Sequence, residues 1–205
     1  MTPRRHRQGG QAITELALSA VVLLLLLTGL LDFARVFYFT SALRGTAFAA
    51  ARHAAWFDPG QRQNPYLCDQ SNTSGGGTCS SGVLDAVNEG LAGAHLSTVS
   101  SIQATCPAPT DGNTAHNPPY DSSAYPTGAN QTYVYVCYTK PDGTTVLGTQ
   151  ANPPPAYDST WHLGDVNVIL LFNYGLLTGF MQQQLQAAGG IHVATNAHFT
   201  VQGGP

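Results

Sequence analysis

Glu15 is the residue whose position most directly suggests chemistry. It lies near the start of an apolar segment, residues 12–31, in which the other polar side chains are Thr14, Ser19 and Thr28. A carboxylate inside an apolar segment of membrane length is costly unless it has a partner, so Glu15 is a candidate functional residue. The plain alternative is a side chain that reaches the lipid headgroups from the edge of the segment.

The remaining titratable residues form no catalytic or metal-binding pattern. His192 and His198 are an even number of residues apart and can share one face of a strand, but no third metal ligand accompanies them. Asp85 and Glu89 have the i, i+4 spacing of a carboxylate pair, which is also the ordinary pattern of a solvated helix face. Motifs of hydrolases, zinc proteases, phosphate loops and dinucleotide sites do not occur. We therefore expect no enzyme activity, no cofactor and no metal.

The four cysteines all follow the apolar segment, at Cys68, Cys79, Cys106 and Cys137. An even number on one side of a membrane segment indicates disulfides in an oxidising compartment. The absence of CxxC argues against a redox dithiol or a zinc ribbon. Of the three possible pairings we favour Cys68–Cys79, which closes a Gly/Ser-rich loop, and Cys106–Cys137, which links two strand-like segments. Free thiols are the alternative.

The apolar segment is long enough to cross a bilayer. Twenty residues rise about 30 Å as a helix, which is about the thickness of the hydrocarbon layer. Arg4, Arg5 and Arg7 precede it, and the positive-inside rule places that end in the cytoplasm. The chain after about Asp32 then lies outside the membrane. A cleaved signal peptide is disfavoured because the residues after Leu31 make a poor cleavage site.

The charge distribution agrees with this topology. Residues 1–62 carry seven Arg against three acids, a net charge of +4. From residue 63 onward, Lys140 stands against eight acids, a net charge of −7. The folded part has no clustered basic face, so we expect no nucleic-acid partner.

The helix is predicted to continue beyond the membrane, over residues 11–57. No proline occurs between Pro3 and Pro59, and residues 41–56 are rich in alanine, the strongest helix former. Asp32 and Arg35 are three residues apart and can pair on one helical face. The membrane segment, 12–31, would be followed by an Ala-rich extension, 32–57, that packs on an outer domain, 58–205.

The outer domain is predicted to be α+β, with a small antiparallel sheet packed against the long helix. A short helix is indicated by apolar residues at helical spacing, and strands are indicated by alternation and β-branched or aromatic composition. Tyr133, Tyr135, Tyr138 and Trp161 fit core packing better than an adhesive surface. The predicted elements are a helix over 83–96, strands over 98–105, 132–139, 165–174 and 191–201, a helical connection over 176–188, and long loops over 107–130 and 148–160.

The N-terminal residues resemble a known kind of leader. Basic residues, then Gly10, then an apolar helix with Glu15 at its fifth position resemble the leader of a type IV prepilin. The sequence that follows Gly10 is similar to the TadE-like family, including residues 29–38 and the Ala-rich residues 47–55. Members of this family are pseudopilins of the tight-adherence (Tad, or Flp) secretion system. The resemblance covers residues 8–57 and implies a pilin-like fold.

The resemblance also implies roles for particular residues. Residues 1–10 would be a cytoplasmic leader that a prepilin peptidase removes by cutting between Gly10 and Gln11. Glu15 would then neutralise the new α-amino group of Gln11 on a neighbouring subunit. Leu16 follows Glu15 where the main Flp pilin typically has tyrosine, which implies a minor or accessory subunit.

The implied partners are the prepilin peptidase, other pilin and pseudopilin subunits, Tad inner-membrane assembly proteins and membrane lipid. The implied location is the cytoplasmic membrane or the pilus, with the outer domain periplasmic or extracellular. The alternative function is an unprocessed signal-anchored envelope protein whose outer domain binds a ligand or a surface.

Overall fold

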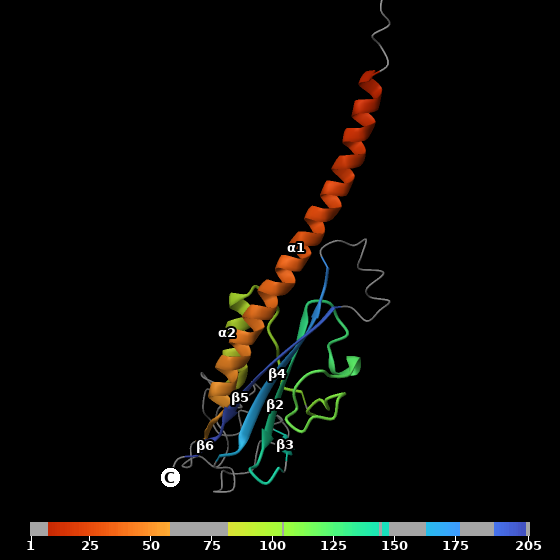
Figure 1. The fold of residues 1–205 in the computed structure, drawn as a ribbon. Helices are drawn as coiled ribbons and strands as arrows, with labels where there is room; N and C mark the ends of the chain where they lie inside the picture. The colour runs from red at the N-terminus through yellow and green to blue at the C-terminus, as the bar shows by residue number, and fades with distance from the viewer. Residues whose placement is uncertain are drawn as a thin grey trace, which may run out of the picture.

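The protein consists of one long helix whose C-terminal half packs on an α+β domain (Figure 1). The structure, a computed structural model, describes residues 8–57, 82–103, 105–143, 145–147, 163–176 and 191–203. The helices are α1 (Gln8–Ala54), α2 (Val83–Gly93) and the short 3-10 helix η2 (Ser122–Ala124). The strands are β1 (Trp56–Phe57), β2 (Gln131–Thr139), β3 (Thr145–Leu147), β4 (Asp165–Tyr174), β5 (Ile191–Thr200) and β6 (Gln202–Gly203).

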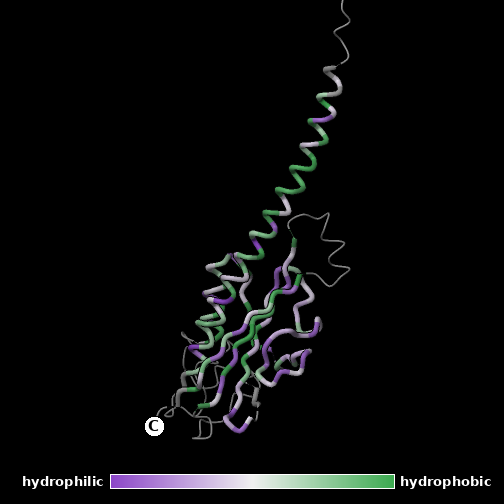
Figure 2. Tube along the Cα trace, in the orientation of Figure 1, coloured by the Kyte–Doolittle hydropathy of each residue, from purple (hydrophilic) through white to green (hydrophobic). Residues whose placement is uncertain are grey.

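The two halves of α1 have different surroundings. Its first half extends beyond the domain and is mostly apolar, as the mainly green stretch in Figure 2 shows. Its second half buries one face against the domain, at intervals of three or four residues that match the helical repeat. The buried residues of this face are Phe39, Leu43, Ala47, Ala50, Ala51 and Ala54. Small alanines on this face allow the helix to lie close to the sheet.

The main sheet has four antiparallel strands in the order β3-β2-β4-β5. The central strand, β4, pairs along its whole length with β5 and along nine residues with β2. After α1 ends, the chain forms β1, which pairs in parallel with β6. The prediction of an α+β fold with a small antiparallel sheet is confirmed.

The two faces of the sheet have different cores because side chains alternate along each strand. The face toward α1 and α2 carries Tyr138 of β2 and Val168 and Phe172 of β4, all fully buried or nearly so. The opposite face, which we call the outer face, carries Tyr135, Cys137, Ile169 and Leu171. Tyr120 and Tyr125, from the segment that precedes β2, cover the outer face.

Helix α2 packs directly on α1, and a glycine allows the close approach. A Cβ atom at Gly90 would overlap the side chain of Thr46 on α1. The apolar face of α2 buries Val83, Val87 and Leu91. The helix predicted over 83–96 is therefore present and ends at Gly93.

The predicted strand over 98–105 is wrong, because no described residue of that span is in a strand. The backbone of Val99 bonds instead to the side chain of Asn88 on α2, with N–H to Oδ1 at 2.7 Å and Nδ2 to the carbonyl at 2.9 Å. Gln103 donates a single backbone bond to Val134 of β2, at 2.8 Å. The strands predicted over 132–139, 165–174 and 191–201 are confirmed as β2, β4 and β5. The loop predicted over 148–160 lies outside the described residues, as does the connection predicted over 176–188 after its first residue, Leu176.

Candidate functional site

The exposed half of α1 is the first candidate site. Every described side chain from Ala12 to Leu31 is exposed except the partly exposed Thr28, and the leucines among them are about half or more exposed. Among the described residues, one helix, Ala12–Ala54, is long and apolar enough to cross a membrane. A helix exposing apolar side chains on all sides suits lipid or other helices better than water. This exposed apolar surface indicates that the protein is anchored in a membrane.

Gly10 and Glu15 lie on this exposed helix. The space beside Gly10 is open, with no atom within 4 Å of where a Cβ would stand. The Thr14 hydroxyl lies 3.4 Å from the Gly10 carbonyl oxygen, to which it donates. Glu15 is exposed, and none of the described side chains bonds to it. Any partner of the Glu15 carboxylate would therefore come from outside the described part of the chain.

A polar and aromatic junction marks the place where α1 meets the domain. Asp32 is 6% exposed and accepts a hydrogen bond from the Tyr174 hydroxyl at 3.4 Å. The Arg35 guanidinium lies over the rings of Phe39 and Tyr174, at 5.7 and 5.9 Å from their centroids. Burial raises the pKa of Tyr174, the nearby Arg35 lowers it and Asp32 raises it further. Asp32 and Arg35, for which the sequence predicted a possible pair, both contact the side chain of Tyr174.

The possible carboxylate pair of α2 does not form a catalytic arrangement. Asp85 accepts a hydrogen bond from the backbone N–H of Gly82 at 3.2 Å, which caps the start of α2. Glu89 is exposed and lines a groove of about 380 Å³ between α1 and α2, together with Tyr38 and His53. The two carboxylates therefore differ in role: Asp85 caps the helix, and Glu89 faces solvent.

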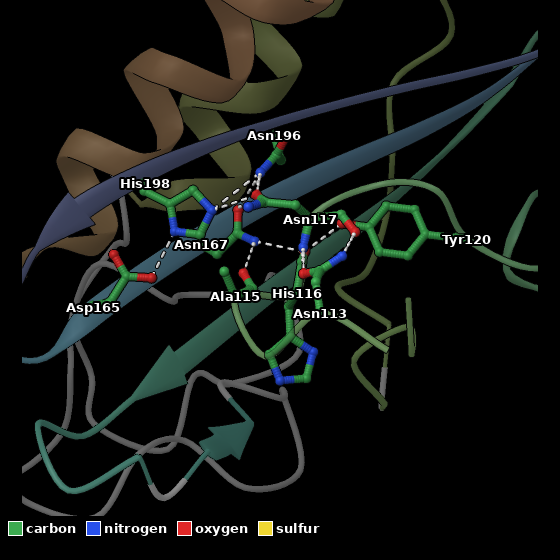
Figure 3. A network of polar contacts seen from close by, with 9 residues as sticks. All are labelled: Asn113, Ala115, His116, Asn117, Tyr120, Asp165, Asn167, Asn196 and His198. Carbon is green, nitrogen blue, oxygen red and sulfur yellow. Dashed lines mark hydrogen bonds and ion pairs between the residues drawn. The ribbon is translucent and has the colours of Figure 1, made fainter. Parts of the chain in front are cut away.

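A polar network on the outer face joins three segments that are distant in the sequence (Figure 3). His198 of β5 bonds through Nδ1 to Asp165 of β4 at 2.6 Å and through Nε2 to Asn117 at 2.7 Å. Asn167 and Asn196 complete the network beside them. Sequence reasoning missed this network because the register of β4 and β5 and the position of Asn117 bring its members together.

The two histidines of β5 share the outer face, as their even spacing suggested. His192 stacks on Tyr125 with ring centroids 4.1 Å apart and an interplanar angle of 8°. His198 belongs to the polar network instead. Among the described residues, no group of three His, Cys, Asp or Glu is placed to hold a metal ion.

A disulfide ties the segment before β2 to the sheet. The structure joins Cys106 to Cys137, a pairing that the sequence analysis favoured, with Cα atoms 6.0 Å apart. Cys68 and Cys79 lie outside the described residues.

The tyrosines of β2 are packed in the two cores, in agreement with the predicted role. Tyr138 is fully buried toward α1, and Tyr135 is buried on the outer face, where its hydroxyl donates to the Ala124 carbonyl at 2.6 Å. Burial raises the pKa of Tyr135 to about 12, and the neighbouring Tyr133 contributes. Burial also raises the pKa values of Tyr120 and Tyr125. Trp161 lies outside the described residues.

A long exposed apolar helix joined to a small α+β domain suggests a membrane-anchored protein. Residues 10–52 match a family model described as TadE-like protein. No curated protein and no solved structure matches the chain. The resemblance to the TadE-like family is therefore confirmed for α1, over nearly its whole length.

Proposed function

We propose that the chain is a TadE-like pseudopilin that acts in assembly of a Tad/Flp pilus or secretion apparatus for adherence. The observation that carries this proposal is that the family match, residues 10–52, falls on α1, whose first half is exposed and apolar. The family match suggests a pilus-associated protein of a structural kind, not an enzyme. The subunit is held in the cytoplasmic membrane by residues 12–31, with its domain on the outer side.

Processing is proposed to occur between Gly10 and Gln11. The exposure of Gly10 supports this, since no part of the described domain would block a protease at that bond. Glycine also lets the backbone approach a protease closely and lowers the cost of opening the helix locally. The prepilin peptidase is the enzyme that this leader would fit.

Glu15 is proposed to act after processing. Cleavage would create a positive α-amino group at Gln11, and the exposed Glu15 of a neighbouring subunit is available to pair with it. Either charge alone would be costly in an apolar helix bundle, so pairing would favour one register of neighbouring subunits. Leu16 beside Glu15 supports a minor or accessory position. The partners would be other pilin and pseudopilin subunits and the Tad inner-membrane assembly proteins.

The mature N-terminus tests the proposal. We expect mass spectrometry of the protein from its native host to show Gln11 as the first residue. Gly10→Leu should leave the full-length N-terminus, because a bulky side chain would obstruct the cleavage site. Gly29→Leu is the matched control, since Gly29 lies in the same helix with equally open space beside it. An N-terminus at Met1 or Thr2 in the unaltered protein would support the signal-anchored envelope protein instead.

A further inference from the structure

The segment of residues 107–121, which we call the outer loop, covers part of the outer face. The disulfide between Cys106 and Cys137 fixes the chain just before it. Farther along, the outer loop is attached to β4 and β5 through the polar network of Figure 3. The hydrogen-bond directions in this network determine what protonation state of His198 it requires.

The orientation of each amide follows from backbone groups that can only accept. Asn167 Nδ2 lies 2.9 Å from the carbonyl oxygen of His116 and 3.4 Å from that of Ala115, so this atom must be the amide nitrogen. The Asn167 oxygen then faces Asn196, whose Nδ2 donates to it at 3.3 Å. The same Nδ2 donates to Asn117 Oδ1 at 2.5 Å.

Asn117 consequently presents an oxygen, and not a nitrogen, to His198. This oxygen lies 2.7 Å from Nε2 of the ring, while the Asp165 carboxylate lies 2.6 Å from Nδ1. Both ring nitrogens therefore face acceptors. A neutral imidazole has one N–H, whereas the imidazolium has two and satisfies both acceptors at once.

In the neutral ring the one N–H stays on Nδ1, because the charged Asp165 carboxylate is a stronger acceptor than the amide oxygen of Asn117. Nε2 then carries a lone pair and has a different best partner. Asn196 Nδ2 lies 3.1 Å from His198 Nε2 and can donate to it when that nitrogen carries a lone pair. In that state the oxygen of Asn117 would face the same lone pair at 2.7 Å, which is repulsive. Asn117 belongs to the outer loop, and Asn196 belongs to the sheet. Loss of the proton therefore weakens the attachment of the loop without weakening the contacts within the sheet.

We propose that His198 is a proton-dependent latch, which holds the outer loop on the sheet when its ring carries both protons and releases Asn117 when it carries one. The side chains of His198 and Asp165 are 32% and 42% exposed, so the ring can exchange protons with solvent. The charged group that contacts the ring is Asp165 of β4. The outer loop carries Asp111, His116 and Asp121, and β2 places the neutral Thr139 opposite Asp165 and is followed by Lys140.

The number of N–H groups on the His198 ring determines the direction of the pH dependence. At low pH the ring donates to both Asp165 and Asn117, and the outer loop is attached. When the ring loses its second proton at higher pH, the bond to Asn117 is lost and the outer loop is held less tightly at Asn117. This inference does not depend on the proposed pilus function, because it concerns residues outside the matched segment 10–52.

Nuclear magnetic resonance of the full chain in detergent micelles tests the latch. We expect the ring ¹⁵N signals of His198 to report two N–H groups at low pH and one after the pH is raised. Over the same range, the hydrogen-exchange protection factor of the backbone N–H of Asn117 should fall about tenfold, as expected for loss of one hydrogen bond to a charged group. Protection factors already divide out the intrinsic pH dependence of exchange. The amide of Leu170 in β4 should stay protected.

Two variants and one control separate the latch from a general effect of pH. His198→Gln should make the protection of Asn117 independent of pH, whereas His192→Gln, on the same face of β5, should preserve the dependence. If His198→Gln does not fold, Asp165→Asn provides a second measurement, because the ring with two N–H groups loses the carboxylate to which it donates. The protection of Asn117 at low pH should then fall. A loop protection that stays the same when the ring changes from two N–H groups to one would overturn the proposal.

Discussion

The Tyr138 hydroxyl donates a hydrogen bond to the backbone carbonyl of Ala54 at 2.8 Å. This contact joins β2 to the last residue of α1. The final carbonyls of a helix have no partner within the helix, and here a buried side chain of the sheet supplies one. The contact therefore fixes the end of α1 to the domain.

We expect Tyr138→Phe to lower the free energy of unfolding by about 1–2 kcal/mol, because the buried carbonyl of Ala54 would lose its partner while the ring packing is kept. Tyr38→Phe is the control, since Tyr38 is 52% exposed on α1 and its change should stay within about 0.5 kcal/mol. Denaturant unfolding in detergent measures both. Equal effects of the two substitutions would show that the cap does not contribute.

The two glycines of α2 should respond to alanine with opposite signs. Gly90→Ala would force a Cβ into Thr46 of α1, and we expect a loss of about 1–3 kcal/mol in stability. Gly93→Ala meets no atom within 4 Å and should be neutral or stabilise the protein by up to about 1 kcal/mol through helix propensity. Thermal unfolding of both variants checks the pair. Stabilisation by Gly90→Ala would contradict the close packing of α1 and α2.

Ionisation of Tyr135 should destabilise the domain at alkaline pH. Its pKa is raised to about 12 by burial, against an ordinary value of 10.0. The folded state thus binds the phenolic proton more tightly than the unfolded state. The stability it contributes is complete below about pH 10 and is lost as the pH rises toward about 12. Tyr135→Phe should make the stability fall less steeply in this window, measured by denaturant unfolding at several pH values. If Tyr135→Phe leaves the slope of stability against pH unchanged, the folded state does not raise the pKa of Tyr135.

Glu15→Gln should separate processing from assembly. If the proposed function holds, mass spectrometry should still find Gln11 as the first residue, because the cleavage site is unchanged. Recovery of the subunit in cross-linked complexes with neighbouring pilins should fall tenfold or more, since the α-amino group would lose its buried partner. Ser19→Ala, in the same apolar segment, should leave both measurements unchanged. Normal recovery of Glu15→Gln in complexes would refute the pairing.

The main elements could be predicted because their signals are local. The uninterrupted helix-forming composition of residues 11–57 identified α1, although the helix ends at Ala54 and Trp56–Phe57 form β1. The β-rich composition of residues 132–139 identified β2. The segment 98–105 had the same alternation as a strand, yet its backbone bonds to a side chain of α2. Local periodicity carries no information about which partner a backbone finds.

The candidate site was predictable to a different extent in its two parts. Gly10 and Glu15 are recognisable from their place before and within an apolar segment. The network around His198 could not be predicted, because Asp165, Asn196 and Asn117 meet through strand register and loop position. The role of Gly90 likewise depends on a neighbour from another helix, Thr46.

The junction at Asp32 and Tyr174 has a mechanical consequence. The segment from Ala12 to Asp32 forms an arm about 30 Å long, and within the described part of the chain it contacts the domain at its base, where Asp32 meets Tyr174. Tilting this arm by about 10° at the junction would displace its far end by about 5 Å, nearly the pitch of one helical turn. If neighbouring subunits pack along this arm, as proposed, a tilt of this size would change which residues of a neighbouring helix face Glu15.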